Sequence, residues 1–346
     1  HPSSRTTSCL LCSGAGRARR VWLQVEGHSV HRVAAFHRAT LVGKAFRASS
    51  PNGRFTDGAA RIDGKPFRQI EAVGKNLFSF FGPPGEAEVV LHVHFGMAGS
   101  WAVWSARDAP SPTATTRLML RGHGLVAHVS AMTVSAGDSS LFSEKRRALG
   151  ADPLRGDADP EWLWRRVMRS RRCVGALLMD QSLFCGPGNI YRAEILFKAG
   201  VHPAVLGLDL TREQFDAIWK HAVLLLRRGY EEGSILTVDE DEAELLGRPQ
   251  LRRYIYNRAE CGRCNGIVRR WQIAGRTCYA CPSCQPLQGP SDAPRQAASK
   301  PFISNCALEE RALRMLQGLH LLKVAELREE LAARGLKASS RMRKAE

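Results

Sequence analysis

The sequence predicts an α+β protein with several domains: a β-rich N-terminal part, a helical middle, a four-cysteine segment and a small helical tail. Three observations lead to this prediction. Short runs of alternating apolar and polar residues fill the first part, a helical period dominates the middle, and five of the ten cysteines lie between Cys261 and Cys284. With 346 residues, the chain is long enough to form two or three domains.

The β-rich part extends from Val33 to about Val134. Runs such as NLFSFFGPPGEAEVVLHVHFGM and TRLMLRGHGLVAHVSAMTV alternate apolar and polar residues and are interrupted by Gly and Pro. This pattern is typical of short antiparallel strands that are joined by hairpins.

The helical middle begins after a loop that contains GADPLRGDADP. Apolar residues recur with a helical period in EWLWRRVMRS, VGALLMDQ, NIYRAEILFKAG and TREQFDAIWKHAVLLLRR. Asp159, and either Asp209 or Thr211, belong to the residue types that cap helix N-termini, so we expect helices to begin just after them.

Gly186, Pro187 and Gly188 stand directly before Asn189, which opens one of these helices. A glycine-rich turn that leaves backbone N–H groups free at a helix N-terminus can bind a phosphate. An ordinary helix with Asn189 as its N-cap fits the same residues. The local sequence does not decide between the two.

The metal-binding candidates are Cys261, Cys264, Cys281 and Cys284, which form the pattern C-x2-C-x16-C-x2-C. Two thiolates from each tight turn, with a hairpin between the pairs, predict one tetrahedral Zn²⁺ site in a reducing compartment. Because sulfur fills all four positions, we expect a structural metal without an open site for water. Cys278 is then an ordinary hairpin residue. A zinc ribbon that binds RNA or protein would carry the same four cysteines.

The chain has 50 Lys and Arg against 33 Asp and Glu, a formal net charge of +17, which makes nucleic acid the first partner to consider. Between Leu251 and Cys284 there are seven Arg and one Glu. Arg276 follows a glycine at the expected hairpin turn, where its guanidinium could bond two phosphate oxygens; in isolation it would be an exposed hairpin residue. For the cluster RRVMRSRR (165–172) we favour a solvated face. No apolar run reaches roughly 18 residues, so we expect no membrane span.

These segments in combination resemble the formamidopyrimidine-DNA glycosylase and endonuclease VIII family. The resemblance rests on LMDQSLFCGPGNIYRAEILFKAGVHP and on the four-cysteine segment that ends GRTCYACPSCQ, and it runs from Val25 to about Gln285. It implies an N-terminal β-sandwich, a helix-two-turn-helix domain and a C-terminal zinc finger. The implied function is repair of oxidised bases in DNA by a bifunctional glycosylase and AP lyase.

The stretch VEGHSVHR matches the catalytic start of that family. Its members begin, once Met is removed, with a residue whose free α-amine attacks C1′ of the damaged nucleotide, followed by Glu; these positions match Val25 and Glu26. An α-amine has a pKa of about 7.7 to 8.0, so a useful fraction is nucleophilic near neutral pH. Gly27 and His28 are similar to the endonuclease VIII branch, and HVSAMTV stands where the other branch has an Arg-Phe pair. We therefore expect oxidised pyrimidines as the main substrates.

The resemblance also assigns residues that contact DNA. Lys75, in an expected β-turn, matches a lysine that binds the phosphate near the lesion and assists catalysis. Met97 matches the side chain that fills the gap left by the flipped base, with core packing as the alternative. Asn189 and Arg276 match the residues that clamp the flanking phosphates, and Arg276 is counted with the catalytic residues as well.

The C-terminal stretch LLKVAELREELAARGLKASSRMRKAE is similar to a SAP module, a small helical DNA-binding motif; a solvated amphipathic helix is the alternative. The expected division of the chain is a leader or wrongly included segment (1–24), a β-sandwich catalytic domain (25–140), a helix-two-turn-helix domain (141–250), a zinc finger (251–286), a linker (287–305) and a SAP-like module (306–346).

Residues 1–24 contain four Arg, four Ser and no acidic residue, a composition shared by organelle presequences and by translated non-coding sequence. Because an amide nitrogen is not a nucleophile, we expect the active protein to begin at Val25. We expect it in the nucleus if the source is eukaryotic, or in an organelle if residues 1–24 are a presequence. If Val25 stays peptide-bonded, the alternative is a catalytically inactive protein that binds damaged DNA.

The resulting hypothesis is a monomeric enzyme that binds damaged duplex or single-stranded DNA and flips the damaged nucleotide out. Val25 then forms a Schiff base with the sugar while Glu26 acts as general acid, and β,δ-elimination cuts the strand. One structural Zn²⁺ is the only cofactor that this hypothesis requires.

Overall fold

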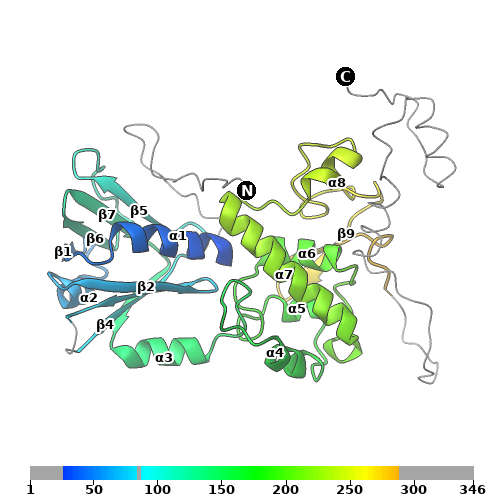
Figure 1. Ribbon diagram of the computed structural model, residues 1–346, viewed down its shortest axis with the longest axis horizontal. Helices are drawn as coiled ribbons and strands as arrows, with labels where there is room; N and C mark the ends of the chain where they lie inside the picture. The colour runs from blue at the N-terminus through cyan, green and yellow to red at the C-terminus, as the bar shows by residue number, and fades with distance from the viewer. Residues whose placement is uncertain (1–25, 84–86, 288–346) are drawn as a thin grey trace, which may run out of the picture.

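The computed structural model describes residues 26–83 and 87–287 (Figure 1). A β-rich half, drawn in blue and cyan, and a helical half, drawn in green, lie side by side along the long axis. The expectations for the leader, for Val25, and for the linker and SAP-like module after residue 287 lie outside the described residues. Within the described part, no helix is long and apolar enough to cross a membrane.

The β-rich half is a sandwich of two four-stranded antiparallel sheets, with strand orders β1–β6–β7–β5 and β2–β3–β4–β8. The strands are β1 Arg47–Ser49, β2 Phe67–Val73, β3 Asn76–Phe81, β4 Val89–His94, β5 Ser100–Ser105, β6 Leu118–Gly122, β7 Leu125–Ser130 and β8 Thr133–Gly137. Alternate residues of each strand point inward, and Phe67, Leu91 and Leu118 from the two sheets share one buried core. The predicted β-sandwich is confirmed.

The beginning of this half differs from the prediction. Helix α1 spans Gly27–Thr40 and helix α2 spans Thr56–Ile62, so the chain from Val33 onward is not built of strands alone. Val30, Val33 and His37 are buried along one face of α1, which packs against β2 and β3. The apolar run of α1 is short, and its period alone does not separate a helix from a strand.

The helical half contains the predicted helices. Their bounds are α4 Pro160–Val167, α5 Val174–Leu177, α6 Asn189–Lys198, a 3₁₀ turn Gly207–Asp209, α7 Arg212–Glu232 and α8 Glu240–Leu245. The Asp159 carboxylate accepts the backbone N–H of Trp162 at the start of α4. Thr211 forms a capping box with Gln214 at the start of α7. The cap prediction is therefore confirmed at Asp159, and at Thr211 rather than Asp209.

Helix α3 (Ser139–Arg147) lies at the point where the sequence placed the boundary between the two halves. Phe142 packs edge-on against Phe78 and Phe80 of β3. The helix therefore covers the outer face of the β2–β3–β4–β8 sheet, below which it is seen in Figure 1.

The four-cysteine segment forms the expected hairpin. Strand β9 (Arg269–Ile273) pairs with β10 (Arg276–Ala280), and β10 packs against α6. Ala274 and Gly275 make the turn with φ angles of 51° and 71°, which matches the left-handed turn that two-residue hairpin loops favour. Arg276 follows this turn directly, as predicted.

Candidate active site

Glu26 and Lys75 meet where the two halves join. Glu26 is the N-cap of α1, and Lys75 lies in the turn between β2 and β3. Lys75 Nζ is 3.2 Å from Glu26 Oε2, and Glu26 is only 5% exposed. Burial raises the pKa of the Glu26 carboxyl above its ordinary value, while Lys75, the backbone N–H of Ile190 and the charge of Arg276 oppose that rise. The carboxyl therefore keeps its proton to a higher pH than an exposed glutamate does.

Glycines bring the backbone segments of this site close together. The Gly27 N–H donates to the carbonyl oxygen of Gly186 over 2.9 Å. Gly74 has a φ of 57°, and a Cβ there would lie 2.2 Å from the sulfur of Cys185. A Cβ on Gly188 would lie 2.3 Å from both Glu26 Oε2 and Lys75 Nζ. The turn before α6 is thus one wall of the site, and it leaves no room for side chains.

Asp152 fixes the turn that carries Lys75. Its Oδ2 accepts the backbone N–H of Gly74 over 2.7 Å and lies 2.8 Å from Nε2 of His31 on α1. Its Oδ1 accepts the backbone N–H of Leu154 over 2.9 Å. Asp152 is almost completely buried. Sequence reasoning missed this residue because GADPLRGDADP indicated only a loop, and nothing local shows that its carboxylate reaches two other elements.

The first turn of α6 meets the hairpin. Asn189 is the first residue of the helix, and Gly188 is the N-cap, so the alternative with Asn189 as N-cap is wrong. The Asn189 side-chain amide donates to the Thr277 carbonyl oxygen over 3.1 Å, and Arg192 contacts both residues. Arg276, next to Thr277, acts electrostatically on Glu26. The described structure thus gathers Glu26, Lys75, Asn189 and Arg276 in one region.

Met97 lies at the same end of the β2–β3–β4–β8 sheet. It follows β4, whose last residue His94 pairs with Asn76, the neighbour of Lys75. Met97 is 83% exposed, so core packing does not explain it. Two further residues there were not foreseen: Met132 is 61% exposed with its side chain against Gly96, and His94, whose pKa burial lowers, lies close enough to Lys75 for its charge to lower that pKa further.

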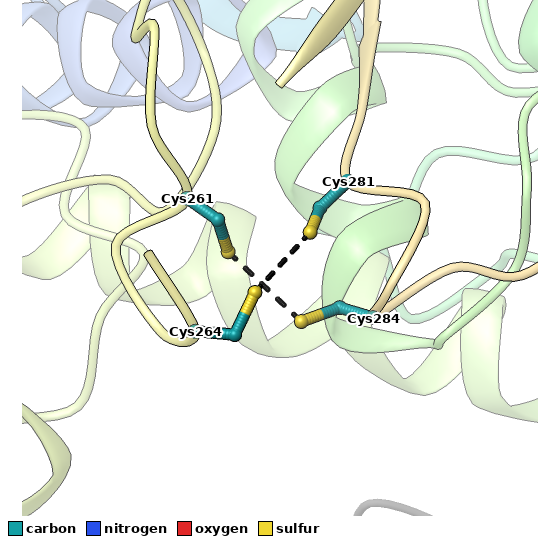
Figure 2. Close-up of side chains that lie close together, drawn as sticks. All are labelled: Cys261, Cys264, Cys281 and Cys284. Carbon is teal, nitrogen blue, oxygen red and sulfur yellow. Dashed lines mark hydrogen bonds between the residues drawn. The ribbon is translucent and has the colours of Figure 1, made fainter. Parts of the chain in front are cut away.

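The four predicted metal ligands converge in Figure 2, where the sulfur atoms point toward one another. The sulfur–sulfur distance is 3.9 Å for Cys261 and Cys284 and 3.4 Å for Cys264 and Cys281, and all four atoms lie within 4.8 Å of one another. Four sulfurs bonded at about 2.3 Å to one tetrahedral ion would be about 3.8 Å apart. The cluster is therefore arranged to hold a metal ion. Cys278 is buried in β10 and stands outside it.

Comparison with known proteins gives concordant results. The family model "Formamidopyrimidine-DNA glycosylase N-terminal domain" matches residues 17–146, and "Formamidopyrimidine-DNA glycosylase H2TH domain" matches residues 149–240. Endonuclease 8 1 of Mycobacterium tuberculosis is 36% identical over 272 residues, which cover 75% of this chain and 99% of that protein. Endonuclease 8 of Pectobacterium carotovorum is 27% identical over 271 residues, with coverage of 75% and 99%.

A solved structure shows the same fold. The Lactococcus lactis Fpg in complex with DNA that contains an abasic site superposes with a TM-score of 0.63 at 20% identity, covering 76% of this chain and 100% of that chain. The matched family models and the relatives indicate the same family, and the solved structure has the same fold. The chain belongs to the family of DNA glycosylases and AP lyases that comprises the formamidopyrimidine-DNA glycosylases and the endonucleases 8.

Proposed function

We propose that this chain excises oxidised bases, chiefly pyrimidines, from DNA and then cleaves the strand at the resulting abasic site. The observation that carries the proposal is the buried Glu26 carboxyl, held beside Lys75 at the N-terminus of α6. A carboxyl whose pKa is raised by burial is suited to general acid catalysis. The names of the relatives support the same activity.

In the proposed reaction the α-amine of Val25, the residue before Glu26, attacks C1′ of the flipped nucleotide. The bond between C1′ and the base breaks, and the base leaves with the bonding electrons and takes up the proton that the amine loses. Glu26 supplies a proton to the ring oxygen of the sugar, so that the C1′–O4′ bond opens and the nitrogen lone pair forms the C=N bond. The product is a Schiff base between C1′ and Val25. β-Elimination and then δ-elimination release the two phosphates that flank the sugar, and hydrolysis frees the amine.

The remaining candidate residues bind the DNA backbone and occupy the space that the flipped nucleotide leaves in the duplex. Lys75, Asn189 and Arg276 donate to phosphates around the lesion, because one ammonium, one amide and one guanidinium converge on the region next to Glu26. Met97, exposed at the same end of the sheet, enters the base stack in place of the flipped nucleotide. The net charge of +17 supports association with DNA.

We assign the metal at the four-cysteine cluster as Zn²⁺. Four sulfur ligands in tetrahedral arrangement suit Zn²⁺ and leave no position for water, so the ion would hold the hairpin rather than take part in the chemistry. The residues that would bind it are Cys261, Cys264, Cys281 and Cys284.

The second candidate function is recognition of damaged DNA without catalysis. It is favoured by the sequence itself, in which residues 1–24 precede Val25. With Val25 in an amide bond, the clamp residues would still bind DNA, but no Schiff base could form at that nitrogen.

Borohydride trapping on an abasic-site duplex separates the two functions. A protein that begins at Val25 should be linked covalently to the DNA, and the full sequence should bind the same duplex without trapping. Glu26→Gln in the shorter protein serves as the matched control for the loss of base excision with binding retained. Equal trapping by the intact full sequence would place the nucleophile on a lysine, with Lys75 the first to test.

A further inference from the structure

Arg192 is a fully buried arginine in the first turn of α6, 0% exposed. Its guanidinium donates to the Gly175 carbonyl oxygen over 3.3 Å, to that of Ile273 over 3.4 Å and to that of Thr277 over 2.9 Å. It also donates to Oδ1 of Asn189. One side chain therefore joins α5, α6 and both strands of the β9–β10 hairpin.

The burial of this charge needs an explanation. Among the described residues no carboxylate forms an ion pair with Arg192, and its Nε has no hydrogen-bond partner. Burial in these surroundings lowers the pKa of the guanidinium. An apolar side chain of similar volume could be buried at lower cost. The fork of the guanidinium, which can reach acceptors on several elements at once, is what an apolar side chain cannot replace.

The acceptors of Arg192 surround the residues proposed to bind phosphate. Ile273 and Thr277 stand on either side of the hairpin turn, so the contacts with their carbonyl groups fix the segment that carries Arg276. The contact with Asn189 fixes the side-chain amide. Because a guanidinium has only donors, Oδ1 must face Arg192 and Nδ2 must face away from it. Nδ2 gives one hydrogen to Thr277, and the second remains for another acceptor.

We propose that Arg192 is a positioning residue that holds Asn189 and the turn with Arg276 in a single arrangement, so that both present donors to the DNA backbone. Arg192 itself does not touch DNA, because its side chain is enclosed by α5, α6 and the hairpin. Without it the Asn189 amide could turn its oxygen toward a phosphate, and the hairpin turn would lose two of its anchors. This inference rests on the proposed function, in which Asn189 and Arg276 bind phosphates.

The first experiment compares Arg192→Met and Arg192→Lys with the wild type. Dissociation constants are measured on a duplex with a tetrahydrofuran abasic-site analogue, which binds without turnover. Both variants should bind on the order of tenfold more weakly, as for loss of a hydrogen bond to a charged group. Lysine keeps the charge but cannot reach acceptors on both sides of the turn. Wild-type affinity in Arg192→Lys would mean that charge alone matters, and wild-type affinity in Arg192→Met would exclude any role in binding.

A cycle of double variants tests the route through Asn189 and Arg276. Arg192→Met combined with Asn189→Ala should lose little more affinity than the worse single variant, whereas additive losses would contradict the shared route. The slope of log affinity against log salt should fall by about 0.9 in Arg276→Ala, one phosphate contact. Arg192→Met added to Arg276→Ala should leave the slope of Arg276→Ala unchanged. A further fall would mean that Arg192 contacts a phosphate itself.

Asn189→Asp tests the contact with Arg192 without disturbing the buried guanidinium. The new carboxylate would pair with Arg192 but would lose the hydrogen bond to the Thr277 carbonyl oxygen, so the melting temperature should fall less in the wild-type background than with Arg192→Met. Equal shifts in both backgrounds would show that the two side chains do not interact. Zinc content is measured in every variant to establish that the hairpin is folded.

The outcomes separate this inference from the proposed function. If Asn189→Ala and Arg276→Ala weaken binding but the Arg192 variants do not, only the positioning role is wrong. If neither Asn189→Ala nor Arg276→Ala weakens binding, the phosphate clamp is wrong and the positioning role falls with it.

Discussion

Gly188→Ala gives a sharp test of the geometry around Glu26. A Cβ at this position would lie 2.3 Å from Glu26 Oε2, 2.3 Å from Lys75 Nζ and 2.6 Å from Glu26 Oε1. Close-packed interiors do not tolerate such overlaps, so the carboxylate and the ammonium must each move by about 1 Å. The backbone at Gly188 has φ −127° and ψ −158°, an extended conformation that alanine adopts. The substitution therefore perturbs the site rather than the chain conformation.

We expect a large loss of activity with a small loss of stability. A displacement of about 1 Å at catalytic groups can reduce a rate on the order of 100-fold. Because the overlapping atoms are the ends of two flexible side chains, the backbone can stay in place. Single-turnover excision of an oxidised pyrimidine should slow by about that factor, while the melting temperature stays close to that of the wild type.

The matched control is Gly156→Ala, at an exposed loop position where a Cβ would meet nothing within 4 Å. It should excise at the wild-type rate. A wild-type rate in Gly188→Ala itself would refute the reasoning, because the ion pair of Glu26 and Lys75 could then not be required in the arrangement described.

Three further predictions concern pH, metal and support of the site. Burial raises the pKa of Glu26 above 4.5, so its ionisation opposes folding, and the wild type loses stability as the pH rises from 4.5 toward the folded-state pKa. The melting temperature of Glu26→Gln relative to wild type should therefore increase between pH 5 and pH 8; a constant difference would contradict the raised pKa. Chelation of the metal should unfold the hairpin and abolish DNA binding. Cys278→Ser should still bind one Zn²⁺ per chain, whereas Cys264→Ser should not, and elemental analysis measures the zinc content of both variants. Asp152→Asn removes the negative charge that faces the Gly74 N–H and His31. The excision rate should fall on the order of tenfold, and the free energy of unfolding should fall by about 1–3 kcal/mol. An unchanged excision rate would mean that other contacts hold the turn with Lys75.

Local signals determined the parts of this protein that depend on near neighbours. The cysteine spacing predicted the metal cluster, because each pair of ligands lies within one turn and the hairpin joins the pairs. Thr211 and Asp159 predicted helix starts, since a cap acts on N–H groups only two or three residues away. The turn at Gly275 placed Arg276 for the same reason.

Tertiary structure decided the rest. Helix α1 was hidden because its apolar face is fixed by β2 and β3, which are distant in sequence. The alternative with Asn189 as N-cap was wrong because the N-cap is Gly188. Glu26 and Lys75, which are distant in sequence, occupy the space where a side chain at Gly188 would lie. Asp152 and Arg192 carried no local signal, since the value of a carboxylate or guanidinium depends on which distant donors and acceptors the fold brings within about 3 Å.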